Sequence, residues 1–339
     1  MIQNPNDTSA ATIFWGIDPF RTRPKEQLRA FNAITKLFGK TPIRIQPVTV
    51  LSLGKSNPMK LDYRDKWDEF VHEAEDQLGE LLAPLNHPGL LRPRVLLSEG
   101  SARFAASREF VKFAVDSGAQ MLVVSTRARK GVGRLLLGSF AEDLVLQSPL
   151  PTLVVHPDHG GKAWSKLRSV LFPTDFSESS FEAFTRTVLL ARVLKLPIRL
   201  YHKLEYLYPD LLPAFLYPAV SKTSLQAYRR ELKQGSREWV EFGQKYGVKV
   251  TLELDGDSDR RLDGILKAQK ALGNSTLIAM ASQSNRTEAI LLGSLSRQVL
   301  RSAPCPVLVV HPDDASVVQR FVNEGRLVGK ARERRPILF

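Results

Sequence analysis

Short apolar runs alternate with longer amphipathic stretches along the chain. The runs MLVV, which begins at Met121, and TLIAMA, at 276–281, show no polar alternation, as is typical of strands covered on both faces of a sheet. Residues 65–85 instead carry apolar side chains at the i, i+3, i+4 spacing of an amphipathic helix. Strands that alternate with helices predict parallel strands joined by right-handed crossovers.

The same order of elements is expected in each half of the chain. In the first half we predict strands at 13–18, 44–53, 94–97, 121–125 and 152–156, and helices at 65–85, 101–117 and 138–147. In the second half we predict strands at 170–175, 198–202, 248–254, 277–281 and 307–311, and helices at 178–194, 225–246, 260–272 and 294–301. Ser101 and either Ser258 or Asp259 are the candidate N-caps. We therefore expect an α/β fold in which each half is an open, doubly wound, five-stranded parallel sheet with its ligand beyond the carboxyl ends of the strands.

An internal repeat shows how the chain is divided. Residues 136–158 read LLGSFAEDLVLQSPLPTLVVHPD and residues 291–313 read LLGSLSRQVLRSAPCPVLVVHPD, at a constant offset of 155 positions. The length of 339 residues also exceeds what a single hydrophobic core usually supports. We predict a first domain at 1–157, a linker at 158–167, a second domain at 168–313 and a charged tail at 314–339.

Composition narrows the functional classes. The formal net charge of +13 favours anionic partners, but the charges are spread over both halves and mark no groove for nucleic acid. The single cysteine excludes a disulfide framework and a multi-cysteine metal site. No stretch approaches the roughly 20 apolar residues that span a bilayer, and the start has no signal-peptide pattern. We therefore expect a cytoplasmic protein without a membrane or nucleic-acid partner.

Motifs at the ends of the halves resemble those of the universal stress protein family. The segment VLFPTDFSESSFEAFTRTVLLA, from Val170, is similar to the start of such a domain, and LLGS followed by a helix and PxPVLVV is similar to its end. The resemblance covers nearly the whole chain as two tandem copies. It implies an adenine nucleotide alpha hydrolase-like sheet of order 3-2-1-4-5 in each half. It also implies that the Val-rich closing strands pair as an internal pseudo-dimer, and it leaves association into a homodimer open.

The resemblance further implies a nucleotide site in some members, with the pattern Gly-x2-Gly-x9-Gly-Ser/Thr between the fourth strand and the last helix. Glycines let the backbone approach phosphate oxygens, and a helix start presents free N–H groups to an anion. The corresponding residues of the first half are Ser125 and Ala128 in place of the two upstream glycines, Gly138, Ser139, and Asp18 at the end of the first strand.

The second half keeps the pattern best at the two outer ends of the site. Ala281 or Met280 fills the first glycine position, depending on where a one-residue gap lies. In the structural alternative, Asp175 and Ser294 serve only as helix caps. Besides Ala281 or Met280, the candidate contacts of this half are Thr174, Asp175, Gly293 and Ser294.

Two histidines and the cysteine have simpler interpretations. His156 and His311 are repeat mates at the ends of the closing strands, but no acidic or cysteine partner recurs beside them, so we expect structural histidines and not a metal pair. Cys305 lies between two prolines without a paired base nearby, and we expect a buried small residue there.

Three functions fit these residues. The first is a stress-response regulator that senses ATP, ADP or AMP, with magnesium accompanying the nucleotide as the only metal. The second is a ligand-free scaffold, with its sites closed by Met280 and Gln283, that binds a protein partner through the aromatic segment 206–223. The third is a slow ATPase, but no catalytic carboxylate pair, Ser-His-Asp set or metal cluster stands out, and we expect no enzyme.

Overall fold

The computed structural model describes most of both halves of the chain. The described residues are 11–17, 31–32, 34–39, 41–52, 67–98, 104–125, 139–155, 166–204, 217–282 and 293–311. The predicted tail at 314–339, most of the predicted linker at 158–167, and residues 206–216 of the aromatic segment lie outside them. The proposed domain boundaries therefore stay predictions.

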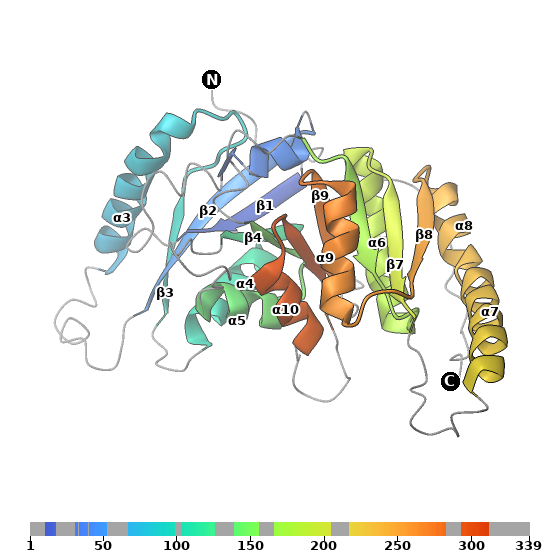
Figure 1. Cartoon of the computed structure of the whole chain (residues 1–339). Coiled ribbons are helices and arrows are strands. Elements are labelled where there is room, and N and C mark those ends of the chain that lie inside the picture. The colour runs from blue at the N-terminus through green and yellow to red at the C-terminus, as the bar shows by residue number, and fades with distance from the viewer. Residues whose placement is uncertain are drawn as a thin grey trace.

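Each half alternates strands with helices, as the hydrophobic pattern predicts (Figure 1). The first half contains β1 (Ala11–Gly16), β2 (Ile43–Ser52), α3 (Trp67–Leu82), the 3-10 helix η2 (Ala83–Leu85), β3 (Arg94–Ser98), α4 (Ala105–Asp116), β4 (Met121–Ser125), α5 (Ser139–Gln147) and β5 (Thr152–Val155). The second half contains β6 (Ser169–Pro173), α6 (Glu178–Leu194), β7 (Ile198–Lys203), α7 (Tyr217–Gly235), α8 (Arg237–Lys245), β8 (Val250–Asp255), α9 (Arg261–Leu272), β9 (Thr276–Ala281), α10 (Ser294–Ser302) and β10 (Val307–Val310). Residues 34–38, ahead of β2, are also helical.

These strands form one ten-stranded sheet. Its order is β3-β2-β1-β4-β5-β10-β9-β6-β7-β8, so each half has the expected order 3-2-1-4-5. The strands are parallel within each half, whereas β5 and β10 pair antiparallel. The two predicted five-stranded sheets are thus joined edge to edge, which confirms the predicted pairing of the closing strands.

The β5–β10 pair relates the two halves by an approximate twofold axis. Leu308 lies opposite Leu153, and Val307 lies opposite Val154. Because the strands of the two halves run in opposite directions, their carboxyl ends lie at opposite edges of the sheet. A site at the carboxyl ends of one half therefore lies at the other edge from its counterpart.

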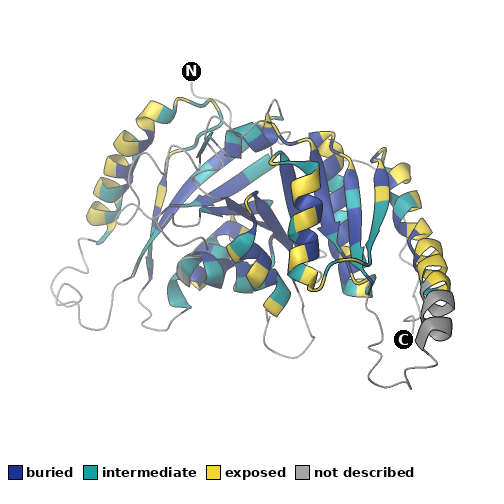
Figure 2. Ribbon diagram, in the orientation of Figure 1, coloured by how far each residue is buried: buried dark blue, intermediate teal, exposed yellow. Residues whose placement is uncertain are grey.

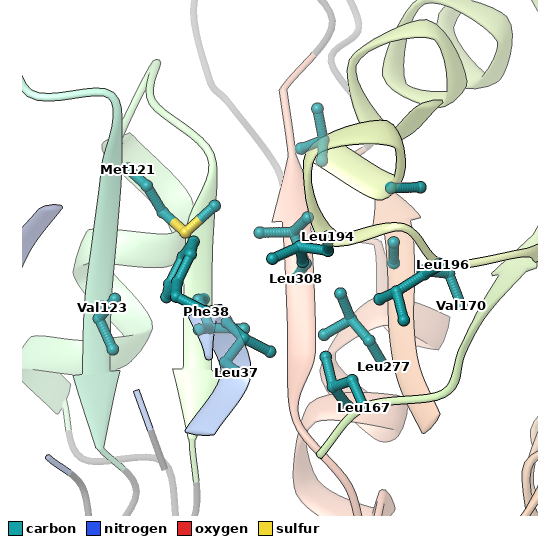
Figure 3. Packing of buried hydrophobic residues seen from close by; sticks show 14 of the residues in the cluster. Leu37, Phe38, Met121, Val123, Leu167, Val170, Leu194, Leu196, Leu277 and Leu308 are labelled. Atoms are coloured by element: carbon teal, nitrogen blue, oxygen red, sulfur yellow. The ribbon is translucent and has the colours of Figure 1, made fainter. Parts of the chain in front are cut away.

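Two hydrophobic layers cover the sheet, one on each face. One layer contains side chains of the helical residues 34–38 and of α3, α6 and α8, and the other contains side chains of α4, α5, α9 and α10. Figure 2 shows the burial concentrated on the strands and on the helix faces turned toward them. In Figure 3, Leu37 and Phe38 of the first half belong to the same cluster as Leu194 and Leu308 of the second. The two halves therefore share both cores.

One predicted helix is divided in the structure. The single helix expected at 225–246 is instead the pair α7 and α8, which are separated at Ser236. Gly235 and Ser236 both disfavour a helix interior. Ser236 Oγ also donates a hydrogen bond to the carbonyl of Lys233, 3.0 Å away.

Both predicted N-caps are wrong. α4 begins at Ala105, four residues beyond Ser101, and α9 begins at Arg261 with Arg260 at its N-cap position. Ahead of α9, Asp255 Oδ1 accepts hydrogen bonds from the backbone N–H groups of residues 257–258, at 2.9 and 3.2 Å. The turn from β8 to α9 is therefore organised by Asp255, the last residue of the strand, and not by a cap at Ser258 or Asp259.

Leu308→Ala is expected to lower the free energy of unfolding by about 2–5 kcal/mol. Leu308 is 1% exposed beside the twofold axis, so the truncation leaves a cavity in a layer that both halves share. Val193→Ala, at a side chain that is 45% exposed on α6, is the control and should change stability by less than about 0.5 kcal/mol. Urea denaturation followed by tryptophan fluorescence measures both variants. Equal stability of the two would contradict the shared core.

Candidate functional site

The strand order reverses between β6 and β9, which is where ligands of such sheets bind. β6 pairs with β7 on one side and with β9 on the other. Leu171 of β6 lies opposite Ile278 of β9, and the two strands run in the same direction. Asp175, two residues after β6, and Ser282, directly after β9, therefore both lie at the carboxyl edge of the second half.

Strand register identifies the repeat mates around this edge. Leu122 lies opposite Thr152, and Ile278 lies opposite Val307. Since Thr152 and Val307 are mates in the repeat, Leu122 and Ile278 are mates as well, and the one-residue gap falls after the fourth strand. The mates at the strand ends are then Ser125 with Ala281, Ile17 with Thr174, and Asp18 with Asp175.

The turn after β6 is held by its own side chains. Thr174 Oγ1 accepts a hydrogen bond from the N–H of Phe176 at 2.9 Å, and Phe176 has a positive φ of 61°. Asp175 Oδ1 accepts from the N–H of Ser177 at 3.0 Å, from Ser177 Oγ at 2.6 Å and from Ser180 Oγ at 2.6 Å. Ser177 is the N-cap of α6 and accepts from the N–H of Ser180. One oxygen of Asp175 thus organises the start of α6.

The three hydrogen bonds that Asp175 accepts at the start of α6 all use Oδ1 and none uses Oδ2. Asp175 itself is exposed. Partial burial acts to raise the pKa of this carboxyl group, but the hydrogen bonds from Ser177 and Ser180 outweigh it and hold the pKa below its ordinary value. Asp175 is therefore an ionised acceptor at neutral pH, with Oδ1 bound at the start of α6 and Oδ2 outside these bonds.

His202, at the end of β7, is a site residue that the sequence analysis did not single out. Its Nδ1 lies 2.8 Å from the carbonyl oxygen of Thr174, which only accepts, so Nδ1 carries the proton. Its Nε2 lies 3.3 Å from Tyr228 Oη and accepts from that hydroxyl group. Burial lowers the pKa of His202, against the hydrogen bond to Thr174 and the charge of Asp175, so the ring is neutral.

The first half has a corresponding hydrogen bond, from a side chain of its second strand to the carbonyl group of the residue before the aspartate. Thr49 Oγ1 donates to the carbonyl of Ile17 at 3.1 Å, and Ile17 is the mate of Thr174. Each half therefore holds the residue before its aspartate by a side chain from the second strand. Periodicity places His202 and Thr49 at strand ends but does not show which carbonyl group they bind.

The start of α10 does not agree with the alternative in which Ser294 serves only as a helix cap. Gly293 occupies the N-cap position and makes no side-chain cap, and Ser294 is the first helical residue and is exposed. Ser294 is therefore not the N-cap of this helix. Because a glycine N-cap leaves the first N–H groups without a side-chain acceptor, this helix start suits an anion.

Ala281, not Met280, stands at the first glycine position. Met280 is 4% exposed and packs in the layer of α9 and α10, whereas Ala281 is half-buried on the other face of the sheet. Its mate Ser125 has a buried Oγ without a hydrogen-bond partner among the described residues. Both halves thus carry a small side chain at this position.

Only some of the predicted site residues of the first half belong to the part of the chain that the structure describes. Asp18, Ala128 and Gly138 lie outside the described residues. α5 begins at Ser139, one residue after the start of the helix predicted at 138–147. The candidate contacts with a described backbone are therefore Ser125, Ser139, Thr174, Asp175, Ala281, Gly293 and Ser294.

A metal site and a reactive thiol find no support in the described part of the chain. No group of three or more His, Cys, Asp or Glu side chains that could hold a metal occurs there. Cys305 is buried, and burial raises the pKa of its thiol to about 12. The search of the described helices for one long and apolar enough to cross a membrane found none.

Asp175→Asn is expected to lower the free energy of unfolding by about 0.3–1 kcal/mol at neutral pH, because the carboxylate lies at the positive end of α6. Asparagine keeps an acceptor oxygen, so the substitution removes mainly the charge. Since the folded-state pKa of Asp175 is lowered, its contribution is full above about pH 4 and is lost as the pH falls through the folded value. Urea denaturation at pH 7 and at lower pH should show the two proteins converging. A difference that does not change with pH would contradict this role.

Comparison with known proteins gives a consistent result over both halves. The sequence model described as the universal stress protein family matches residues 26–156 and residues 166–311. A universal stress protein of Methanocaldococcus jannaschii is 26% identical over 147 residues, which cover 42% of this chain and 81% of that protein.

Solved structures show the same fold over the full tandem arrangement. A universal stress protein from Archaeoglobus fulgidus aligns with a TM-score of 0.59 at 18% identity, covering 89% of this chain and 98% of that chain. A putative universal stress protein from Pseudomonas aeruginosa aligns with a TM-score of 0.55 at 14% identity, covering 94% and 99% of the two chains. These similarities concern the fold alone.

Proposed function

Because the chain belongs to the universal stress protein family, we propose that it is a stress-response regulator that senses an adenine nucleotide, namely ATP, ADP or AMP, in its second half. The observation that supports this proposal is that two groups occur at the carboxyl edge of the second half, where the strand order reverses. These are the exposed Asp175, after β6, and the glycine-capped start of α10, the helix that follows β9. One suits a ribose or adenine donor, and the other suits a phosphate.

The arrangement supports binding more than catalysis. A general base works best with a pKa near the operating pH, and the hydrogen bonds on Asp175 hold its pKa below the ordinary value. His202 uses both ring nitrogens within the chain, one toward Thr174 and one toward Tyr228. We therefore propose a sensor, with phosphate hydrolysis no part of its function.

The loss of the upstream glycine is compatible with a weaker site. Ala281 adds one methyl group at the end of β9, where the pattern of nucleotide-binding members has glycine. Ser294 keeps its hydroxyl group at the first turn of α10, where it adds a donor for a phosphate oxygen. Magnesium would accompany the nucleotide through the phosphates, since the described residues offer no cluster of metal ligands.

Isothermal titration calorimetry of the full chain with ATP, ADP and AMP tests the site. We expect binding by the wild-type protein and at least about tenfold weaker binding by Asp175→Asn, because the ligand then loses its bond to a charged acceptor. Ser180→Ala is the matched control: it removes one hydrogen bond from Oδ1 and leaves Oδ2 charged, so its affinity should stay near that of the wild type.

Two outcomes would count against the proposal. Absence of binding at millimolar concentrations of all three nucleotides would leave the site without a ligand. Equal loss of affinity in Asp175→Asn and Ser180→Ala would show that Asp175 acts only through the start of α6.

A further inference from the structure

His311, the residue after β10, is buried at the junction of the two halves. It is 4% exposed, and both of its ring nitrogens and its carbonyl oxygen take part in hydrogen bonds. Its Nδ1 lies 2.6 Å from Ser282 Oγ, its Nε2 lies 2.9 Å from the carbonyl oxygen of Val145, and its own carbonyl accepts from Arg186 Nη1. Val145 belongs to the first half and is 166 positions away, whereas Ser282 and Arg186 belong to the second.

The bond of the ring to α5 has a defined direction. The Val145 carbonyl only accepts, so Nε2 of His311 carries the proton and donates it. On the other side of the ring, Nδ1 forms a hydrogen bond with the Ser282 hydroxyl group. Ser282 is 0% exposed, so its hydroxyl group has no water to replace the bond. The result is a buried path from Ser282 through His311 to α5.

The second-half end of this path lies at the proposed nucleotide site. Ser282 follows β9 directly, at the same carboxyl edge of the second half as Asp175. Arg186 lies on α6, the helix whose first turn Asp175 organises. Two elements of the site, the end of β9 and α6, are therefore attached to the same histidine.

The first-half end of the path leads to the counterpart site. α5 has nine residues and is thus about 13 Å long. It begins at Ser139, the mate of Ser294, at the carboxyl edge of the first half. It ends before β5, whose first residue Thr152 lies opposite Val309 at the other edge of the sheet. The helix therefore extends from the neighbourhood of His311 to the start of the first-half loop.

We infer that His311 is a positioning residue that couples the two halves: a change at Ser282 is transmitted through the imidazole ring to α5. For nucleotide, this inference rests on the proposed function, because ligand at Asp175 would then alter the order of α5 and with it the first-half site. The mechanical link itself requires no ligand and is tested separately.

A second contact between the halves serves as a comparison. Arg301 of α10 and Glu142 of α5 form an ion pair at 3.5 Å, with 50% and 17% of their side chains exposed. This pair joins the two helices at the surface and does not involve Ser282 or His311. Removing it should weaken the junction without interrupting the path.

Hydrogen exchange of the full chain, read by mass spectrometry, tests the link without ligand. In Ser282→Ala, peptides covering α5 should exchange about tenfold faster than in the wild type, because a buried hydrogen bond that holds the ring is lost. Peptides covering α4, in the same layer of the same half, are the internal control and should not change.

Variants of His311 separate a link from a general loss of stability. Gln places its amide near the position of Nε2 and Asn near that of Nδ1, so His311→Gln retains the reach to Val145 and His311→Asn retains the reach to Ser282. In either background, adding Ser282→Ala should no longer change the exchange of α5. In Arg301→Gln the response to Ser282→Ala should persist. An unchanged α5 in Ser282→Ala, or the same response with and without His311, overturns the inference.

Added ATP distinguishes the two proposals. If ATP binds, it should slow the exchange of α5 in the wild type and not in His311→Asn; ATP binding that leaves α5 unchanged in the wild type overturns the coupling of ligand to the first half. If ATP does not bind, the proposed function fails, and the response of α5 to Ser282→Ala alone decides whether the link exists.

Discussion

The antiparallel pairing of β5 with β10 is the constraint on which the rest of the molecule depends. All four residues of each of these strands are buried in the paired sheet. Unpaired, each would be an edge strand that exposes apolar side chains and free backbone groups. Pairing them closes both edges at once and makes each hydrophobic layer continuous from one half to the other. It also reverses the strand direction between the halves, which puts the two candidate sites at opposite edges of one sheet.

Asp175 illustrates how one side chain serves structure and binding together. Its Oδ1 accepts three hydrogen bonds from residues at the start of α6, and its Oδ2 takes no part in them. The structural and functional interpretations of this aspartate are therefore compatible, because they use different oxygens. The same division does not hold for Ser294, which follows the N-cap Gly293 and has no capping role.

The two halves keep a common frame while their polar details differ. The bond from the second strand to the residue before the aspartate comes from a threonine in one half and from a neutral histidine in the other. His202 additionally binds Tyr228 on α7. The two halves lie in one chain and share their cores. The hydrogen bond between His311 and the Val145 carbonyl joins them at the junction, and through it we expect a structural change in the second half to reach α5.

The order of strands and helices along the chain and the duplication were predictable from the sequence, because they depend on local periodicity and on a repeat that can be read directly. The pairing of the closing strands was predictable only through the resemblance to a known family. Asp175 follows β6, and Gly293–Ser294 lie at the start of α10, close to the predicted strand end and helix start; their part in binding stays a prediction. The choice of Ala281 over Met280 was not predictable, since it depends on register between strands that are distant in sequence. The division of labour between the two oxygens of Asp175 and the roles of His202 and His311 were also out of reach. These arise from hydrogen bonds whose partners are defined only once the sheet is assembled, up to 166 positions apart along the chain.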